Sequence, residues 1–340
     1  MNTPPSAARR FRHHAMACDW DFWLCPADAA HLDQAARAAF AEVDRIEGEL
    51  SRFIQTSDVA RINAARAGRA IRVGVETLEC LELAAQVHAD TGGRFDVTVG
   101  GLLPRREASA WEPAQEASAR AVGMRLLSID RARRTVTKLA DRLVIDLGAV
   151  GKGYALDLAA GVLREWGATA ALLHCGQSTV LALGSPPAPP GARGWTVGLR
   201  DAASQARVLG HVVLRDAALS GSGRVVHGDH IIDPLDTTRS ADAAVNAAPP
   251  RIHASWALAP SAALSDALST AFFLLSAEEI AAYCDAHPGV RGIVSTDDSH
   301  FAEYGAGPAF ARLADLRSQP LPDGRGSDHA DRRGSDRAPG

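Results

Sequence analysis

Residues 146–157 of this chain read Asp-Leu-Gly-Ala-Val-Gly-Lys-Gly-Tyr-Ala-Leu-Asp, so an acid, a glycine-rich turn and a lysine stand together. A short β-like run ends immediately before them, at Val144 and Ile145. Apolar residues then recur with the period of a helix as far as Trp166, and Gly167 ends that helix. The glycines are therefore expected at a helix N-terminus.

Such a terminus favours a phosphate group. The first backbone N–H groups of a helix have no intrahelical partner, the helix dipole is positive there, and Lys152 adds a full charge. A nucleotide is the expected ligand. The segment is not a Walker-type loop, which needs glycine and a hydroxyl residue where this chain has Asp146 and Gly153. Taken alone, an ordinary strand-to-helix turn with a solvated lysine remains the alternative.

The composition is that of an ordinary globular protein of 340 residues, of which 46% are hydrophobic, enough for one large domain or two closely packed ones. A net charge of −4 argues against nucleic-acid binding. No run of about 18 apolar residues occurs, so no membrane span is expected. Residues 1–14 are basic, read as a flexible segment, and lack the apolar core of a signal peptide, which favours a cytoplasmic location.

The five cysteines are odd in number, scattered and without a Cys-x-x-Cys pair, so they indicate reduced core residues rather than a disulfide framework or a zinc site. They are Cys18, Cys25, Cys80, Cys175 and Cys284.

Periodicity predicts a mixture of helices and short strands along the chain. Besides the helix after Lys152, helices are expected over residues 32–53, 77–90, 262–275 and 277–286, the last with a Ser276–Glu279 capping box. Strands are expected over residues 18–24, 170–183, 194–199, 212–219 and 293–295, and as a pair within 125–145 that turns at 130–134. Residues 186–190 and 240–251 are predicted loops, and the Gly-, Arg- and Asp-rich residues 319–340 are predicted to be a disordered tail.

A cation site is a further possibility in the helix over residues 262–275. Asp266 and Thr270 are four residues apart, so both side chains project from one face and offer oxygen to a hard cation. A solvated pair is the alternative at that spacing.

In order along residues 15–315, several segments resemble the FAD:protein FMN transferase family, the ApbE-like flavin transferases. The matching blocks are residues 47–63, 93–101 (Gly-Arg-Phe-Asp-Val-Thr-Val-Gly-Gly), 146–157, 230–234 (His-Ile-Ile-Asp-Pro) and 264–271 (Leu-Ser-Asp-Ala-Leu-Ser-Thr-Ala). Five blocks in the same order are far more specific than any one of them.

The resemblance implies an α+β fold, T-fold-like, in which two intimately packed halves hold the nucleotide between them, over residues 15–318. It implies that FMN passes from FAD to a threonine hydroxyl of a target flavoprotein, which forms a phosphoester bond and releases AMP, with Mg²⁺ at the pyrophosphate. Metal charge neutralisation and positioning supply the acceleration in such a transfer.

The resemblance also implies roles for individual residues. Asp266, Thr270 and the backbone carbonyl of Ala149 are expected to hold Mg²⁺, and Lys152 is expected to neutralise phosphate charge in catalysis. The residues expected to contact FAD are Met16, Phe53, Arg94, Phe95, Asp96, Asp146, Lys152 and Ile231. His230 is the candidate base for the threonine hydroxyl, oriented by Asp233, because histidine titrates near neutral pH. A structural histidine that braces the following turn is the alternative for His230.

Several positions depart from the family pattern. The usual Met-Gly-Thr is Met16-Ala17-Cys18, an expected Gly-Gly-Asp is Gly176-Gln177-Ser178, an expected proline is Gly101, and Thr-Gly-x-Pro is replaced over residues 236–239. The phosphate and Mg²⁺ side is intact, so FAD binding is better supported than transfer. An FAD pyrophosphatase that gives FMN and AMP, and a non-catalytic FAD-binding protein, therefore stay open as alternatives.

Overall fold

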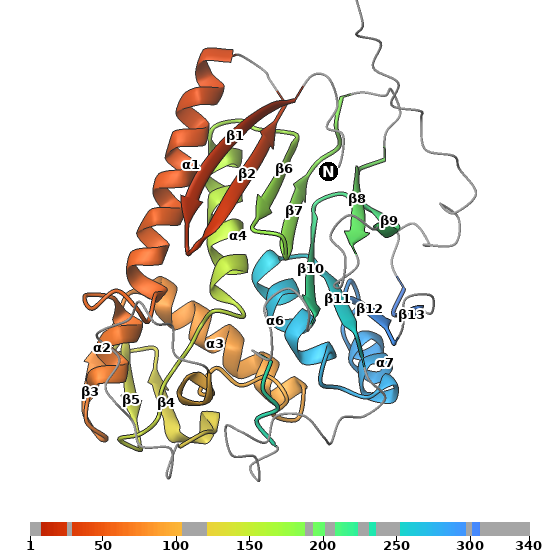
Figure 1. Ribbon diagram of the computed structural model, residues 1–340. Coiled ribbons are helices and arrows are strands. Elements are labelled where there is room, and N and C mark those ends of the chain that lie inside the picture. The colour runs from red at the N-terminus through yellow and green to blue at the C-terminus, as the bar shows by residue number, and fades with distance from the viewer. Residues whose placement is uncertain are drawn as a thin grey trace, which may run out of the picture.

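The computed structural model describes residues 8–25, 29–103, 121–187, 193–200, 208–223, 231–235, 252–296 and 301–306 (Figure 1). The fold is α+β, as expected. The strands are β1 (Arg9–Ala15), β2 (Cys18–Leu24), β3 (Ala70–Arg72), β4 (Leu127–Asp130), β5 (Thr135–Lys138), β6 (Ala171–Cys175), β7 (Thr179–Leu183), β8 (Trp195–Arg200), β9 (Val208–Leu214), β10 (Ala217–Gly223), β11 (Ala254–Ala259), β12 (Arg291–Ser295) and β13 (Phe301–Tyr304). The helices are α1 (Ala29–Leu50), α2 (Asp58–Ala64), α3 (Val75–Asp90), α4 (Gly151–Glu165), α6 (Ala262–Phe272) and α7 (Ala277–Ala286), with short 3-10 turns η1 (Gly100–Leu102) and η2 (Met124–Leu126).

An antiparallel sheet of eight strands, in the order β1-β2-β6-β7-β10-β11-β12-β13, carries helices on one face. Strand β6 shows why both faces are covered, because alternate residues of a strand point to opposite sides. Leu173 lies in the core beneath α1, α4 and α6, whereas Leu172 lies in a second core with Trp195 of the β8–β9 hairpin. Figure 1 shows α1 and α4 running alongside β1, β2 and β6.

Aromatic packing attaches the long helix α1 to this sheet. Phe22 of β2 is fully buried, and its ring stacks on that of Phe40 in α1 with centroids 4.5 Å apart. Burying a side chain of this size contributes about 1.5–3 kcal/mol. This contact fixes the position of α1 along the sheet. It therefore also fixes the position of residues 51–53, which follow the C-terminal end of α1.

A smaller sheet, β3-β5-β4, lies with α2 and α3 beyond that end of α1 (Figure 1). Asn63 of α2 joins the smaller sheet's layer to the chain that leads into α4. Its side-chain amide donates to the carbonyl of Ile145 at 2.9 Å and accepts from the Ile145 N–H at 2.8 Å. The residues on either side of Ile145 bond to the backbone of residues 97–100, since the Val144 carbonyl accepts from the Gly100 N–H at 3.1 Å and the Asp146 N–H donates to the Val97 carbonyl at 2.8 Å.

Several predicted elements are confirmed with small shifts. Strand β2 and helix α7 have the predicted bounds, and the Ser276–Glu279 capping box is present. The predicted helix over residues 32–53 is α1, which ends at Leu50. The predicted strand over residues 170–183 is two strands, because the chain turns at Gly176 with φ +57°. The strand predicted over residues 212–219 is likewise split between β9 and β10.

The sequence interpretation is wrong at the N-terminus and misses several elements elsewhere. Residues 9–14 were assigned to a flexible N-terminal segment, but they form β1 with Ala15, and β1 pairs with β2 along its whole length. Its sequence, Arg-Arg-Phe-Arg-His-His-Ala, hides the alternation of a strand because polar side chains occupy both faces of this outermost strand. Helix α2 and strands β3, β11 and β13 were also not predicted.

Among the residues that the structure describes, no helix is long and apolar enough to cross a membrane. His230, the predicted loop over residues 240–251 and the predicted tail over residues 319–340 lie outside the described ranges.

Candidate functional site

The predicted glycine-rich turn does precede a helix, since α4 begins at Gly151. Two short contacts fix the turn. Asp146 accepts a hydrogen bond from the Gly148 N–H through Oδ1 at 2.7 Å, and Lys152 Nζ donates to the Gly148 carbonyl at 2.6 Å. The lysine is thus folded back over the turn, next to the first N–H groups of the helix. This is the arrangement that binds anions at a helix N-terminus.

Helices α4 and α6 meet at Gly153, and only glycine fits there. A Cβ at this position would lie 2.2 Å from the carbonyl oxygen of Ala262. One turn further along α4, Asp157 accepts hydrogen bonds from the N–H groups of Ala262 and Ala263 at 2.8 and 2.9 Å, which satisfies the first donors of α6. The two helix starts are therefore locked together.

That junction brings Asp266 to the start of α4. Its side chain is buried, Oδ2 accepts from the Gly153 N–H at 3.1 Å, and Oδ1 accepts from the Thr179 hydroxyl at 3.3 Å. Burial lowers the pKa of Lys152, but the Asp266 carboxylate and other nearby acids outweigh it and hold that pKa above its ordinary value. The predicted lysine and the predicted metal ligand are thus neighbours at the start of α4.

Hydroxyl groups continue the site along α6. Thr270 Oγ1 lies 3.5 Å from Ser222 Oγ of β10, and Ser222 lies 2.9 Å from the Ser269 hydroxyl. Within the described ranges, no three His, Cys, Asp or Glu side chains gather at one point. A cation here would therefore depend on Asp266, a hydroxyl and backbone carbonyl oxygen. Mg²⁺ fits this donor set, because it prefers oxygen and takes few protein ligands beside water and phosphate.

The structure adds one residue that the sequence analysis did not select. Arg52, just after α1, is 8% exposed and forms an ion pair with Asp146, with Nε 2.9 Å from Oδ2. It also donates to the Gly100 carbonyl at 2.9 Å and lies over the Phe53 ring, 4.8 Å from its centroid. Asp146 is therefore already paired with a cation. The only sequence signal was the position of Arg52 inside a matching block.

Three other residues predicted to bind FAD, Met16, Phe53 and Ile231, differ in how exposed they are. Met16 is half-buried in the β1–β2 turn, which both it and Ala17 enter with positive φ, +50° and +56°. Phe53 is 37% exposed, and Arg52 lies over one face of its ring. Ile231 is half-buried. Their contact with FAD stays a prediction.

Phe95 and Asp96 are buried and serve the fold. Asp96 Oδ1 accepts from the N–H and hydroxyl of Thr98 at 2.8 and 2.5 Å, and Oδ2 accepts from the Met124 N–H at 3.2 Å. The Phe95 carbonyl is hydrogen-bonded to His88 Nδ1 at 2.8 Å. These two residues shape the loop that carries Arg94.

Arg94 and Asp233 are brought together as an ion pair, with Nη1 2.5 Å from Oδ2. They are 139 residues apart in sequence, so the pair attaches residues 231–235 to the loop after α3. Asp233 also caps its own turn through the Leu235 N–H at 3.0 Å. Its predicted partner His230 is outside the described residues, so the proposed orientation of a base by Asp233 stays a prediction.

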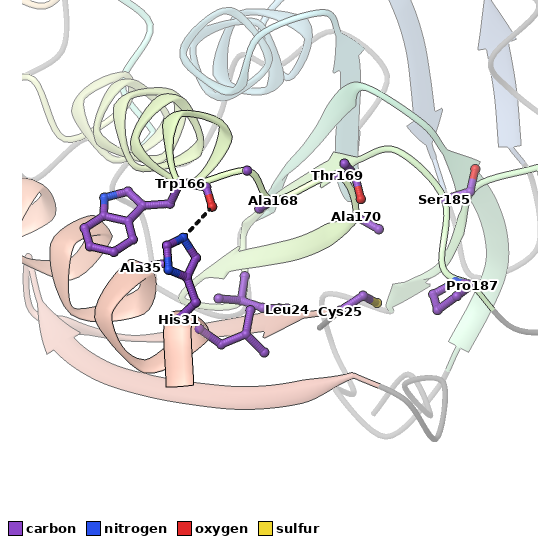
Figure 2. A pocket seen from close by; sticks show the side chains of 12 residues that line it. Leu24, Cys25, His31, Ala35, Trp166, Ala168, Thr169, Ala170, Ser185 and Pro187 are labelled. Atoms are coloured by element: carbon purple, nitrogen blue, oxygen red, sulfur yellow. Dashed lines mark hydrogen bonds between the residues drawn. The ribbon is translucent and has the colours of Figure 1, made fainter. Parts of the chain in front are cut away.

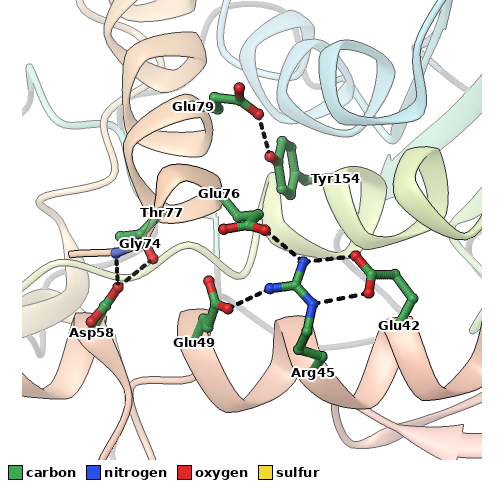
Figure 3. A network of polar contacts seen from close by, with 9 residues as sticks. All are labelled: Glu42, Arg45, Glu49, Asp58, Gly74, Glu76, Thr77, Glu79 and Tyr154. Atoms are coloured by element: carbon green, nitrogen blue, oxygen red, sulfur yellow. Dashed lines mark hydrogen bonds and ion pairs between the residues drawn. The ribbon is translucent and has the colours of Figure 1, made fainter. Parts of the chain in front are cut away.

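A polar network steadies the entrance to α4 from the α3 side (Figure 3). The Tyr154 hydroxyl donates to Glu79 Oε2 at 2.6 Å. Beside it, Arg45 of α1 pairs with three carboxylates, those of Glu42, Glu49 and Glu76, at 2.6–2.7 Å. Helix α4 is thereby joined to α3 as well as to α6.

One cavity lies away from this site (Figure 2). It has a volume of about 200 Å³ and is lined by residues at the end of β2, the start of α1 and the end of α4, among them Cys25, His31 and Trp166. Trp166 follows the last residue of α4, whereas Lys152 is the second, so roughly 20 Å of helix separates them at 1.5 Å per residue. The cavity is therefore separate from the site formed by Lys152 and Asp266 at the start of α4.

The chain is similar in sequence and fold to known proteins. The sequence model of the ApbE family matches residues 16–294. An FAD:protein FMN transferase of Rhodobacter capsulatus is 31% identical over 72% of this chain, which spans about half the length of that relative (47%). One of Vibrio cholerae is 25% identical over 77% of this chain and 81% of the relative.

The solved flavin transferase ApbE of Vibrio cholerae has the same fold, with a TM-score of 0.71, 23% identity and coverage of 88% of this chain and 97% of that one. The ApbE protein of Thermotoga maritima also shares it, with a TM-score of 0.72, 22% identity and coverage of 87% and 97%. The chain belongs to the ApbE family.

Proposed function

We propose that this chain transfers FMN from FAD to a threonine hydroxyl of a target flavoprotein and releases AMP, with Mg²⁺ at the pyrophosphate. Membership of the ApbE family and relatives named FAD:protein FMN transferase support the reaction class. The observation that carries the proposal is the meeting of Lys152, the first turn of α4 and Asp266 at the Gly153 junction. A buried acid beside a lysine at a helix N-terminus suits a metal-bound diphosphate.

The reaction needs one bond to form and one to break. The threonine oxygen attacks the FMN phosphorus of FAD, the bond from that phosphorus to the bridging oxygen breaks, and AMP leaves with that oxygen. The threonine proton passes to a base, for which His230 is the candidate, with Asp233 as its partner. Bound Mg²⁺ supplies charge neutralisation at the phosphates.

The chain's own residues do the positioning. Asp266 and Thr270, with the Ala149 carbonyl, would hold the cation, and Lys152 would face the phosphate oxygens. Arg52 keeps Asp146 paired, and Asp146 keeps the Gly148 N–H in place. Met16 and Phe53 would pack against the rings of FAD.

The deciding experiment measures AMP released from FAD by the purified protein, with and without Mg²⁺ and an Asp-Gly-x-Thr-Gly-Ala-Thr peptide, while the peptide is weighed by mass spectrometry. A peptide heavier by one FMN, with AMP in equal amount, supports the transferase. AMP with an unmodified peptide indicates hydrolysis to FMN and AMP or the wrong acceptor. Bound FAD without AMP would identify a binding protein and overturn the proposal.

Conservative variants separate the roles. Asp266→Asn keeps the size of the side chain but loses its charge, and we expect Mg²⁺-stimulated turnover to disappear. Thr270→Val should lose turnover that Thr270→Ser retains, since serine keeps the hydroxyl ligand. Unchanged Mg²⁺ dependence in Asp266→Asn would remove the metal assignment.

His230→Ala tests the base separately. Turnover should fall by about a hundredfold or more while FAD affinity is kept, the usual scale for loss of a general base. Collapse of FAD binding in this variant would mean that His230 is structural.

A further inference from the structure

Two cysteines that the proposed reaction does not use lie against each other beside the site. Cys18 is the first residue of β2 and Cys175 the last of β6, and their sulfur atoms are 3.7 Å apart. They are diagonal neighbours on the helix-covered face, because Cys175 pairs in register with Trp20. The sequence analysis treated both as separate core residues.

The backbone at both positions borders a turn. Cys18 follows the Met16–Ala17 turn, and Cys175 precedes Gly176, whose φ is +57°. An ideal Cβ on Gly176 would lie 3.4 Å from the Cβ of Cys18, so the two turns are in contact. A disulfide needs the sulfurs at about 2.05 Å. The two sulfurs must therefore approach by about 1.7 Å, which side-chain rotation and a shift of the two adjoining turns would have to supply.

The surroundings make the two thiols unequal. Cys18 is half-buried, and the hydrogen bond from Cys175, aided by the charge of Lys152, lowers the pKa of its thiol. Cys175 is buried, and burial raises the pKa of its thiol. An accessible thiol that ionises readily, with a protected one in contact, matches the attacking and resolving members of an exchange pair.

We propose that Cys18 and Cys175 form a reversible disulfide that weakens FAD binding, an inference whose second half rests on the proposed function. The oxidant is a small-molecule disulfide of the glutathione class. The Cys18 thiolate attacks one of its sulfurs and releases one thiol. Cys175 then loses its proton and attacks the Cys18 sulfur, which releases the second thiol. The protein loses two hydrogen atoms, and the small disulfide becomes two thiols.

Weaker binding follows from where the bond would pull. Met16, the expected flavin contact, is two residues from Cys18 in a turn of positive φ, so drawing Cys18 toward Cys175 displaces it. Lys152 lies close enough to both sulfurs for their charges to raise its pKa, so the phosphate side is affected too. By linkage, bound FAD must oppose formation of the disulfide by the same factor.

The test equilibrates the full chain in glutathione buffers of increasing oxidised fraction, with and without FAD and Mg²⁺. Peptide mapping under non-reducing conditions identifies the bond, and flavin fluorescence gives the FAD Kd. We expect a Cys18–Cys175 peptide pair, an FAD Kd raised about tenfold and restored by dithiothreitol, and a matching shift of the midpoint when FAD is bound.

Variants in which one cysteine is replaced by serine provide the controls. Cys18→Ser and Cys175→Ser should lose the response to oxidised glutathione. Cys25→Ser, at the other end of β2, should respond like the wild type, because Cys25 does not contact the pair. Absence of the Cys18–Cys175 bond, or a response that persists in Cys18→Ser, overturns the proposal.

The measurement of the FAD Kd distinguishes a failure of this redox proposal from a failure of the proposed function. Reduced wild type that fails to bind FAD overturns the proposed function, while peptide mapping still reports whether the bond forms. Reduced protein that binds FAD, and binds it equally well after the bond has formed, overturns only the redox proposal.

Discussion

At the scale of single residues, Arg52 has the clearest energetic role, because it is a nearly buried cation whose partner belongs to the glycine-rich turn. Arg52→Met removes the charge while keeping much of the stem, and it leaves Asp146 unpaired at 17% exposure. We expect a loss of about 3 kcal/mol in the free energy of unfolding, measured by urea denaturation, the low end for a broken buried ion pair because Asp146 keeps some contact with water.

A matched control lies on the preceding helix. Arg45 also binds carboxylates (Figure 3), but its side chain is 41% exposed, so Arg45→Met should cost only about 1 kcal/mol. In a double-mutant cycle, Asp146→Asn should make the Arg52→Met change less costly. Equal effects at the two arginines would show that burial does not strengthen the Arg52 pair.

A second residue sets part of the response to pH. Burial lowers the pKa of His174 to about 4, from an ordinary 6.5. Between those values the unfolded chain binds a proton that the folded chain does not. The contribution of neutral His174 to the free energy of unfolding is therefore fully present above pH 6.5 and is lost as the pH drops toward 4. His174→Gln should flatten that part of the curve, measured as Tm from pH 7 to 4.

His14→Gln is the control for this measurement. The hydrogen bond that His14 Nδ1 donates to Asp19 raises the pKa of this exposed histidine, so His14 favours the folded state at low pH. Its removal should leave the acid-side loss of stability in place or make it steeper. A curve that His174→Gln does not change would mean that solvent reaches the ring.

At the scale of elements, the junction of α4 and α6 depends on two glycines of α4 in opposite ways. Gly153→Ala would place a Cβ 2.2 Å from the Ala262 carbonyl, so the helices must separate and the Asp266 contact is lost. We expect about 2–4 kcal/mol of destabilisation and loss of FAD binding. Gly161→Ala meets nothing within 4 Å and should stabilise by about 0.5–1 kcal/mol. Thermal unfolding and FAD titration of both variants make the comparison.

Elements with a strong local signal were predictable from the sequence. Helix α7 carries its capping box, β2 alternates, and α4 follows a glycine-rich turn. Strand β1 was not predictable, because its polar side chains are accommodated by ion pairs such as Arg9–Asp33 that depend on the folded chain. Strand β11, whose six residues are all buried, shows no alternation and was missed as well. Local pattern therefore identified elements with a clear period or cap and missed strands without one.

The candidate site divides in the same way. Lys152, Asp266 and Thr270 stand in recognisable blocks, and the structure brings Lys152 and Asp266 together. Arg52 and Asn63 were not selected, because each acts on residues more than 80 positions away in sequence, Asp146 and Ile145. Contacts of that range are fixed by packing, which a single sequence does not display.

At the scale of the whole molecule, the site joins the end of α1, the start of α4 and α6, so ligand binding should stabilise the entire chain rather than one segment. A ligand that binds only the folded state adds about 2.7 kcal/mol at a hundred times its Kd. FAD with Mg²⁺ should therefore raise Tm by several degrees, measured by calorimetry. The increment due to Mg²⁺ should vanish in Asp266→Asn, whereas that variant should still respond to FAD alone. Riboflavin, which has no phosphate for Lys152 to face, should stabilise far less than FAD. If riboflavin stabilised the chain as much as FAD does, the start of α4 would not be a phosphate site.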